Sequence, residues 1–198
     1  MVINTLDEQI CYLSLCLINY IKGAKKMSKN LFLIEPSYEY RAAFQIVVKD
    51  YKNAYENVHY NLYKGALEDF KKFVDTLREH SKGINLPKGW VQYSTFWLTS
   101  ESKEILGIIR IRNEPLKIYG HIGYDVPPSY RGNGYGTKLL KLSLEKVKQM
   151  NTKELLITCD DDNIGSIKII ERNGGELVDK VFDEEDQVYV EIYKIDFE

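Results

Sequence analysis

Three glycines at alternate positions, between a strand-like run and a long amphipathic pattern, constrain this chain more than any other feature. The segment Arg131-Gly132-Asn133-Gly134-Tyr135-Gly136 follows an apolar run that ends at Val126 and a turn that contains proline. After it, apolar residues recur at helical spacing: Leu139, Leu140, Leu144 and Val147. Glycines let backbone amides approach an anion, and the first N–H groups of a helix lack intrahelical partners. The segment therefore predicts a strand–loop–helix unit that binds an anion, with Arg131 adding a positive fork.

Two familiar phosphate-binding loops do not fit these glycines. A Walker loop needs Gly-Lys-Ser/Thr after a four-residue gap, whereas Gly136-Thr137-Lys138 reverses that order. A dinucleotide fingerprint needs Gly-x-Gly-x-x-Gly and an acidic residue about 20 residues later. Here the acidic cluster after Cys159 comes too late. Nucleotide hydrolysis and a Rossmann fold are therefore disfavoured.

The order of apolar patterns predicts a mixed α/β domain with helices on both faces of the sheet. A first strand is expected at 31–34, then helices that start at Pro36-Ser37 and at Ala66, the second ending at His80. An antiparallel meander follows, with strands at 90–99, 105–112 and 118–126 and a turn at Asn113–Pro115. The last part alternates helix 134–150, strand 155–159, helix 163–171 and strands 176–182 and 188–195.

Composition excludes several classes of function. The chain has 27 Lys+Arg against 29 Asp+Glu, a formal charge of −2, and no basic tract that would coat nucleic acid or an anionic membrane. Its 3 cysteines predict no disulfide framework and favour a reducing, cytoplasmic location. The histidines lack other ligands at metal-binding spacing, so no metal is expected.

The first 26 residues are interpreted as an extension outside the domain, which is expected to cover residues 27–198. The uncharged run Ile10–Ile21 is shorter than the roughly 20 residues that span a bilayer. Asp7 and Glu8 precede it, which is unlike a signal peptide. Met27-Ser28-Lys29-Asn30 resembles a second start before the first strand. A docked apolar helix is the alternative for this segment.

The residues from 131 to 136 resemble the Arg/Gln-x-x-Gly-x-Gly/Ala loop of the GNAT superfamily of acyl-CoA-dependent N-acetyltransferases. The resemblance extends from Leu31 to Ile195, with a strand exit at Val126-x-Pro128 and Asn163-x-x-Ser166 opening the next helix. Four further segments are similar to a bacterial subgroup of predicted acetyltransferases: 83–87, 94–98, 121–124 and 156–160. The resemblance implies a GNAT-type, mostly antiparallel sheet of six to seven strands.

The resemblance also implies roles for individual residues. Backbone amides of the loop and first helical turn would bind the coenzyme A pyrophosphate, and the pantetheine arm would follow the preceding strand. The implied coenzyme-binding residues are Tyr124, Val126, Arg131, Gly132, Asn133, Gly134, Tyr135, Gly136, Thr137, Asn163 and Ser166. Asn163 also suits a helix N-cap, and the two roles are compatible.

Catalytic roles are less defined by the resemblance. The backbone N–H of Tyr124 is expected to face the developing oxyanion. His121 and Asp125 are candidate bases for deprotonating the amine, with Asp160, Tyr130 or a water relay as alternatives. The family often has a tyrosine that protonates the leaving thiolate, and Ile170 stands in its place. An alkyl thiol has a pKa near 8.5, so this loss is expected to reduce the rate by about 10²–10⁴ rather than abolish activity.

The predicted function is transfer of an acetyl group from acetyl-CoA to a primary amine of a small molecule or peptide, in a ternary complex. A non-catalytic acyl-CoA sensor or partner-binding module is the alternative, motivated by Ile170. The protein is expected to be a monomer or homodimer with no nucleic-acid or membrane partner. Arg110 and Arg112 share a strand face and either line a cleft for an anionic acceptor or form a solvated face, the latter favoured. Cys159 is expected to be a small hydrophobe rather than a nucleophile.

Overall fold

The computed structural model describes residues 30–116, 118–149 and 154–197. The predicted extension at residues 1–26 lies outside these described residues. The N-terminal elements are β1 (Leu31–Ile34), the 3-10 turn η1 (Tyr38–Tyr40), α2 (Arg41–Asn53), α3 (Asn57–Tyr63), α4 (Gly65–Glu68) and α5 (Phe70–His80). The middle of the chain forms β2 (Tyr93–Ser100), β3 (Ile105–Leu116), β4 (Gly120–Asp125), η2 (Pro128–Tyr130) and α6 (Tyr135–Gln149). The last elements are β5 (Glu154–Asp160), α7 (Ile164–Glu171), β6 (Glu176–Asp183) and β7 (Val188–Asp196).

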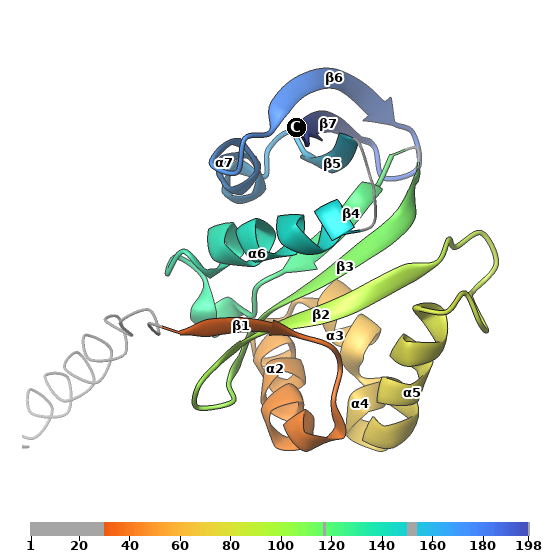
Figure 1. The fold of residues 1–198 in the computed structure, drawn as a ribbon, viewed down its shortest axis with the longest axis vertical. Coiled ribbons are helices and arrows are strands. Elements are labelled where there is room, and N and C mark those ends of the chain that lie inside the picture. Colours follow the sequence, from red (N-terminus) through yellow and green to blue (C-terminus); the bar gives the residue numbers. More distant parts are fainter. Residues whose placement is uncertain (1–29, 117, 150–153, 198) are drawn as a thin grey trace, which may run out of the picture.

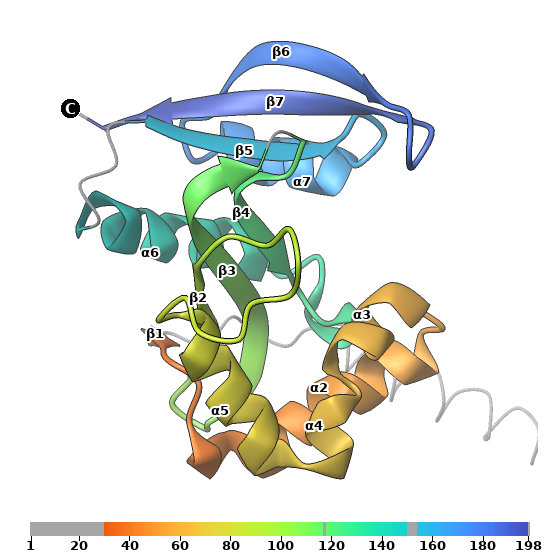
Figure 2. The same cartoon turned by 90° about the vertical axis from the view of Figure 1, so that its right-hand side faces the viewer.

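The strands form one sheet in the order β1-β2-β3-β4-β5-β7-β6 (Figure 1). All neighbouring strands are antiparallel except β4 and β5, which are parallel because the chain returns through α6. Figure 2 shows the sheet twisting strongly, so that β5, β7 and β6 cross the direction of β2 and β3. The prediction of a mixed, mostly antiparallel sheet with helices on both faces is confirmed.

The sheet separates two apolar cores, and the alternation of side chains along β2 shows how. Phe96 and Leu98 pack on the side of α6, whereas Trp97 packs with α2 and α5 on the other. Trp97 is fully buried, and its ring lies 4.9 Å from that of Phe44 between ring centroids. Helices α2 to α5 therefore cover β1 to β3 on one face, and α6 and α7 cover the opposite face (Figure 1).

The predicted turn at Asn113–Pro115 is wrong, because β3 continues to Leu116. Its pairing with β4 shifts register between Ile111 and Leu116, and Pro115 lies within this irregular stretch. Proline lacks the N–H that regular pairing requires, so it is tolerated where the ladder is interrupted. A local breaker in the sequence marks an irregular stretch of strand here, not the end of the strand.

The N-terminal helices also differ from the expected pair. The pattern from Ala66 to His80 divides at Asp69, whose extended backbone ends α4 and whose side chain accepts the amide of Lys72 as the N-cap of α5. Helix α3 was not predicted, since only two of its residues, Tyr60 and Tyr63, contact the core. Ser37 caps η1, and α2 itself begins at Arg41.

Gly120, at the start of β4, provides a test of how β4 is held against β5. Its φ is +53°, and a Cβ there would lie 2.6 Å from the carbonyl oxygen of Leu156. Gly120→Ala should therefore lower the free energy of unfolding by about 2–4 kcal/mol, since strain and a backbone clash combine. Gly89→Ala is the matched control, because Gly89 has φ +84° and open space around it. The control should cost about 1 kcal/mol in denaturant unfolding; equal costs would contradict the clash.

Candidate functional site

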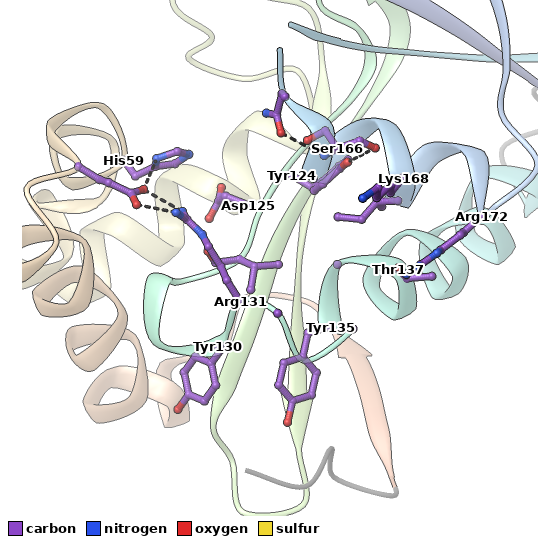
Figure 3. A pocket seen from close by; sticks show the side chains of 18 residues that line it. His59, Tyr124, Asp125, Tyr130, Arg131, Tyr135, Thr137, Ser166, Lys168 and Arg172 are labelled. Carbon is purple, nitrogen blue, oxygen red and sulfur yellow. Dashed lines mark hydrogen bonds and ion pairs between the residues drawn. The ribbon is translucent and has the colours of Figure 1, made fainter. Parts of the chain in front are cut away.

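A cavity of about 600 Å³ opens beside the strand–loop–helix segment (Figure 3). Its walls come from α3, the end of β4, the glycine loop with the first turn of α6, and α7. The lining residues are Glu56, His59, Tyr124, Asp125, Val126, Tyr130, Arg131, Gly132, Gly134, Tyr135, Gly136, Thr137, Asn163, Gly165, Ser166, Lys168, Ile169 and Arg172. The structure thus brings together all the predicted coenzyme-binding residues except Asn133. That residue instead donates its side-chain amide to the carbonyls of Tyr130 and Arg131 within the loop.

The cavity reaches the place where β4 and β5 separate. Their parallel ladder contains one pair, Ile122 with Ile157. Beyond Ile122, the edge of β4 that faces β5 therefore has no strand partner, and Tyr124, Asp125 and Val126 line the cavity. Asn163 and Ser166, which follow β5, line the same cavity. An extended ligand could pair with the free edge of β4 between the two strands.

The backbone amides of residues 132–137 make no hydrogen bond to any described residue. The first amide with a partner is that of Lys138, which donates to the carbonyl of Gly134 at 3.1 Å. Gly132 and Gly134 have φ of +75° and +77°, which a side chain would strain. At Gly136 a Cβ would lie 2.5 Å from Cδ1 of Ile169, so glycine lets α6 start close to α7. This run of unpaired N–H groups at a helix N-terminus is suited to an anion.

Arg131 does not present a free guanidinium to the cavity. Its Nη1 and Nη2 donate to the two carboxylate oxygens of Glu56 at 2.6 and 2.8 Å, and its Nε donates to the carbonyl of Val126 at 2.9 Å. Its own amide donates to the carbonyl of Pro128. The side chain therefore ties the loop to the start of α3, and sequence reasoning missed the carboxylate that it binds.

His59 on α3 is a second cavity residue that the sequence did not indicate. Its Nδ1 lies 3.4 Å from Oε2 of Glu56, and its ring stacks on that of Tyr51 with centroids 4.8 Å apart. Figure 3 places it on the α3 wall of the cavity, across from Tyr124 and Ser166. Glu56 and His59 were missed because α3 itself was not predicted.

Asp125 is buried and forms the centre of a hydrogen-bond network. Tyr51 and Tyr63 donate their hydroxyls to its carboxylate at 2.7 and 2.6 Å, and Nη2 of Arg110 donates at 3.0 Å. Burial and the neighbouring Asp125 raise the pKa of Tyr51, so its hydroxyl remains a donor. Burial alone would lower the pKa of Arg110, but Tyr63 and Asp125 raise it overall. Because both oxygens of Asp125 already accept hydrogen bonds, its geometry is that of a structural anion joining α2, α3, β3 and β4.

His121 does not line the cavity. Its Nδ1 accepts the amide of Leu156 at 3.0 Å, which joins β4 to β5. The nitrogen that accepts cannot carry the proton, so the neutral ring carries it on Nε2. Burial lowers the pKa of His121 and favours this neutral form. Neither nitrogen of this tautomer is free to accept a proton, so the geometry does not support the predicted role as a base.

The remaining predicted residues have mixed roles. Asn163 accepts the amide of Ser166 at 3.0 Å and so caps α7, as expected, while its side-chain nitrogen has no partner among the described residues. The hydroxyl of Tyr124 donates to the carbonyl of Ser166, and burial raises its pKa to about 12. Burial raises the pKa of the Cys159 thiol to about 12, which agrees with an unreactive side chain.

Two cations, one on α7 and one at its C-terminal cap, complete the cavity. Lys168 and Arg172 both line it, and neither forms an ion pair with a described residue. They lie near Thr137, at the end of the cavity formed by the start of α6 (Figure 3). The spacing of four residues was an available signal that they share one face, although the predicted helix ended at residue 171, one residue before Arg172. In the described ranges, no three His, Cys, Asp or Glu side chains are grouped to hold a metal ion. No helix in that part of the chain has the length and apolar character needed to cross a membrane.

The contact between Glu56 and Arg131 leads to a pH-dependent prediction. A partly exposed bidentate pair contributes about 1 kcal/mol, so Glu56→Gln and Arg131→Gln should each lower Tm by about 2–4 °C. The double variant should lose less than the sum. Arg131 holds the pKa of Glu56 below its usual range, so the stabilisation exists above the usual glutamate pKa and is lost as pH falls through the lowered value. In calorimetry the difference between wild type and Glu56→Gln should vanish in acid, and a difference that persists there would contradict this.

The network around Asp125 is tested by comparing two variants. Asp125→Ala leaves Arg110 partly buried without its carboxylate, which should cost about 3–5 kcal/mol in the free energy of unfolding. Tyr51→Phe removes one hydroxyl donor from the same carboxylate and should cost about 1–2 kcal/mol. Urea unfolding measures both. Equal small costs would show that Arg110 does not depend on Asp125.

Comparisons with known proteins agree with this arrangement. MccE, a microcin C7 self-immunity acetyltransferase in complex with acetyl-CoA and AMP, superposes with a TM-score of 0.64 and 16% identity, covering 85% of this chain and 93% of that one. RimL, a ribosomal alpha-N-protein acetyltransferase in complex with coenzyme A, superposes with a TM-score of 0.65 and 18% identity, covering 86% of this chain and 96% of that one. RimJ from Mycobacterium smegmatis, in complex with a CoA disulfide, superposes with a TM-score of 0.64 and 15% identity, covering 84% of this chain and 81% of that one. At these identities, the likeness shows the fold alone.

No curated protein gives a significant sequence match. The profile of the acetyltransferase (GNAT) family, however, matches residues 60–175, more than half of the chain. This range contains the glycine loop, the separated strands β4 and β5, and the cap of α7. The chain therefore belongs to the GNAT family of acetyltransferases.

Proposed function

We propose that this chain binds acetyl-CoA in the cavity and transfers the acetyl group directly to a primary amine. The observation that carries the proposal is the run of unpaired amides at residues 132–137, which lies in the wall of a cavity of about 600 Å³. Such a run needs an anion with several oxygens to satisfy it, and a pyrophosphate supplies them. MccE and RimL, which share the fold, are complexes with acetyl-CoA and coenzyme A.

The residues present fit the rest of this donor. Lys168 and Arg172 supply positive charge without a carboxylate partner in the described ranges, which suits additional phosphate. The edge of β4 beyond Ile122 suits the amide-containing pantetheine arm, because an extended chain with its own N–H and C=O groups can pair with a free strand edge. The carbonyl of Val126 already accepts a hydrogen bond from Nε of Arg131, and this contact holds the end of the free β4 edge in place.

Arg131 has an indirect role in this proposal. Its guanidinium is directed to Glu56 on α3, and its amide is bonded within the turn. The donor would therefore be held mainly by the backbone of residues 132–137, while Arg131 holds α3 against the loop. The near-neutral chain would thus bind its anion through local dipoles rather than an overall positive field.

The chemistry depends on the thioester, which supplies an activated acetyl group: the amine forms a C–N bond, the C–S bond breaks, and the amine loses a proton. We assign the backbone N–H of Tyr124 to the developing oxyanion, since an amide held in a strand needs no reorganisation. Ile170 is fully buried and gives no proton to the departing sulfur. A thiol pKa near 8.5 makes the thiolate an acceptable leaving group at neutral pH.

The same buried Ile170 favours a second candidate, a protein that binds acyl-CoA without transferring the acyl group. Release of coenzyme A thiol with a panel of amines, amino acids and peptides distinguishes the two. Amine-dependent release supports the transferase. Tight acetyl-CoA binding without release on any member of the panel supports the binding module.

Gly134→Asp tests the position of the donor. This change places a side chain and a negative charge at a cavity residue with φ +77°, so it should weaken acetyl-CoA binding by about tenfold or more, or 1.4 kcal/mol. Gly174→Asp is the matched control, because Gly174 has φ +86°, open space and no place in the cavity wall. Isothermal titration should show an unchanged affinity for the control. Unchanged affinity in folded Gly134→Asp would exclude this site.

A further inference from the structure

Arg112 is a partly buried cation that no described carboxylate neutralises. Its Nη1 donates to the carbonyls of Tyr119 and Gly120 at 3.0 and 3.3 Å, and no ion pair joins it to a described residue. Burial lowers its pKa, and the charge on Arg110 lowers it further. The acidic turn after β6 raises the pKa of Tyr119, and none of its carboxylates forms an ion pair with Arg112. Its Nε and Nη2 donate to no described residue.

Arg110, its neighbour on the same face of β3, shows the contrast. That guanidinium is neutralised by Asp125, with its side chain 17% exposed. The two adjacent guanidinium groups have one carboxylate between them, that of Asp125. One positive charge is therefore left uncompensated at a position that is partly removed from water. Removing a charge from water without a partner is costly, so an anion bound beside Arg112 would be stabilised.

Both guanidinium groups converge on Gly123 of β4. A Cβ at Gly123 would lie 3.7 Å from Nε of Arg110 and 3.7 Å from Nη2 of Arg112. These are ordinary van der Waals distances, so the two guanidinium groups lie directly over the backbone of Gly123, which only a residue without a side chain allows this closely. Gly123 directly precedes Tyr124, so this place lies one residue, about 3.3 Å along the strand, from the amide assigned to the oxyanion.

His121 adds a hydrogen-bond donor on the same face. Side chains alternate along β4, so His121 and Gly123 point to the same side of the sheet. Because Nδ1 of His121 accepts the amide of Leu156, its Nε2 carries the proton and donates to no described residue. Arg112 lies near this ring, because its Nη1 donates to the carbonyl of Gly120, the residue before His121. This face of β4 therefore offers a cation and a neutral N–H donor.

We propose that Arg112, with His121 beside it, binds the carboxylate of the acceptor, so that the acceptor is a small amino acid with its amine a few bonds away. The inference rests on the proposed acetyl transfer and specifies its acceptor. The planar edge formed by Nε and Nη2 of arginine matches the two oxygens of a carboxylate. An α- or β-amino acid held there has its amine near Tyr124, where the thioester is proposed to lie. The proposal takes up the cleft for an anionic acceptor, the alternative to a solvated arginine face that the sequence left open.

The test compares amino acids with their carboxamides, which keep the amine and remove the negative charge. We expect wild-type protein to acetylate at least one amino acid with a kcat/KM about tenfold or more above that of its carboxamide, in an assay of thiol release from acetyl-CoA. The carboxamide has the more easily deprotonated amine, so intrinsic reactivity favours the opposite order. Equal values for every pair, or preference for carboxamides, would overturn the inference.

Variants then locate the preference. Arg112→Gln should reduce it by about 10- to 100-fold, the cost of a lost charged hydrogen bond. Arg112→Lys keeps the charge and should retain part of it. Arg41→Gln is the matched control, since the side chain of Arg41 is exposed on α2 and forms no hydrogen bond or ion pair with a described residue. A carboxylate preference that persists in folded Arg112→Gln would overturn the role of Arg112.

A binding measurement covers the case in which no acceptor is acetylated. N-acetyl amino acids and their carboxamides are titrated into the protein saturated with coenzyme A, with calorimetry as the readout. Tighter binding of the acids, lost in Arg112→Gln, supports the carboxylate site, and absence of acid binding overturns it. The proposed function fails separately, if acetyl-CoA itself does not bind. Acetyl-CoA affinity should stay unchanged in Arg112→Gln, because Arg112 is not part of the donor cavity.

Discussion

The single parallel contact between β4 and β5 is the constraint on which the site depends. Because these strands pair only at Ile122 and Ile157, they separate at the ends from which the glycine loop and α7 begin. The backbone edge of β4 that is left without a strand partner then lies in the same cavity as the amides of residues 132–137. Strand, loop and helix thus offer hydrogen-bond donors and acceptors to one extended ligand, and the surrounding antiparallel pairs hold them in place.

Three arginines near β4 differ in their partners: Arg110 and Arg131 each pair with a carboxylate, whereas Arg112 pairs with none of the described carboxylates. Glu56 neutralises Arg131 and thereby joins α3 to the loop, while Asp125 neutralises Arg110 and joins α2 and α3 to the strands. These two carboxylates hold the short helix α3 beside the cavity, although few of its residues pack in the core. Arg112 lacks such a partner in the described part of the chain, which leaves its charge available to an anionic ligand outside the donor cavity. The acceptor proposal follows from this unequal distribution.

The fold was largely predictable because its signals are periodic. Alternation in the strands and the spacing of leucines in α6 depend on neighbouring residues, and they identified most of the elements in order. The division of the helical pattern at Asp69 and the continuation of β3 through Pro115 were not predicted. Whether Asp69 caps a helix, or Pro115 ends a strand, depends on the hydrogen-bond partners that the tertiary structure supplies or removes. Helix α3 gave no signal, because its stability comes from Tyr63 and the ion pair of Glu56 rather than from an apolar stripe.

The sequence by itself determined the unpaired amides at residues 132–137, because positive φ at glycine and the missing partners of a first helical turn are local properties. It also determined the family, through residues that lie close together in the chain. Only the tertiary structure decided which charges meet. Glu56 and Arg131 are 75 residues apart in the chain, and Tyr51 and Asp125 are 74 apart, so their pairing depends on the packing of helices against the sheet. The same packing set the tautomer of His121 and left Arg112 without a partner among the described carboxylates. Neither property can be predicted from a local sequence pattern.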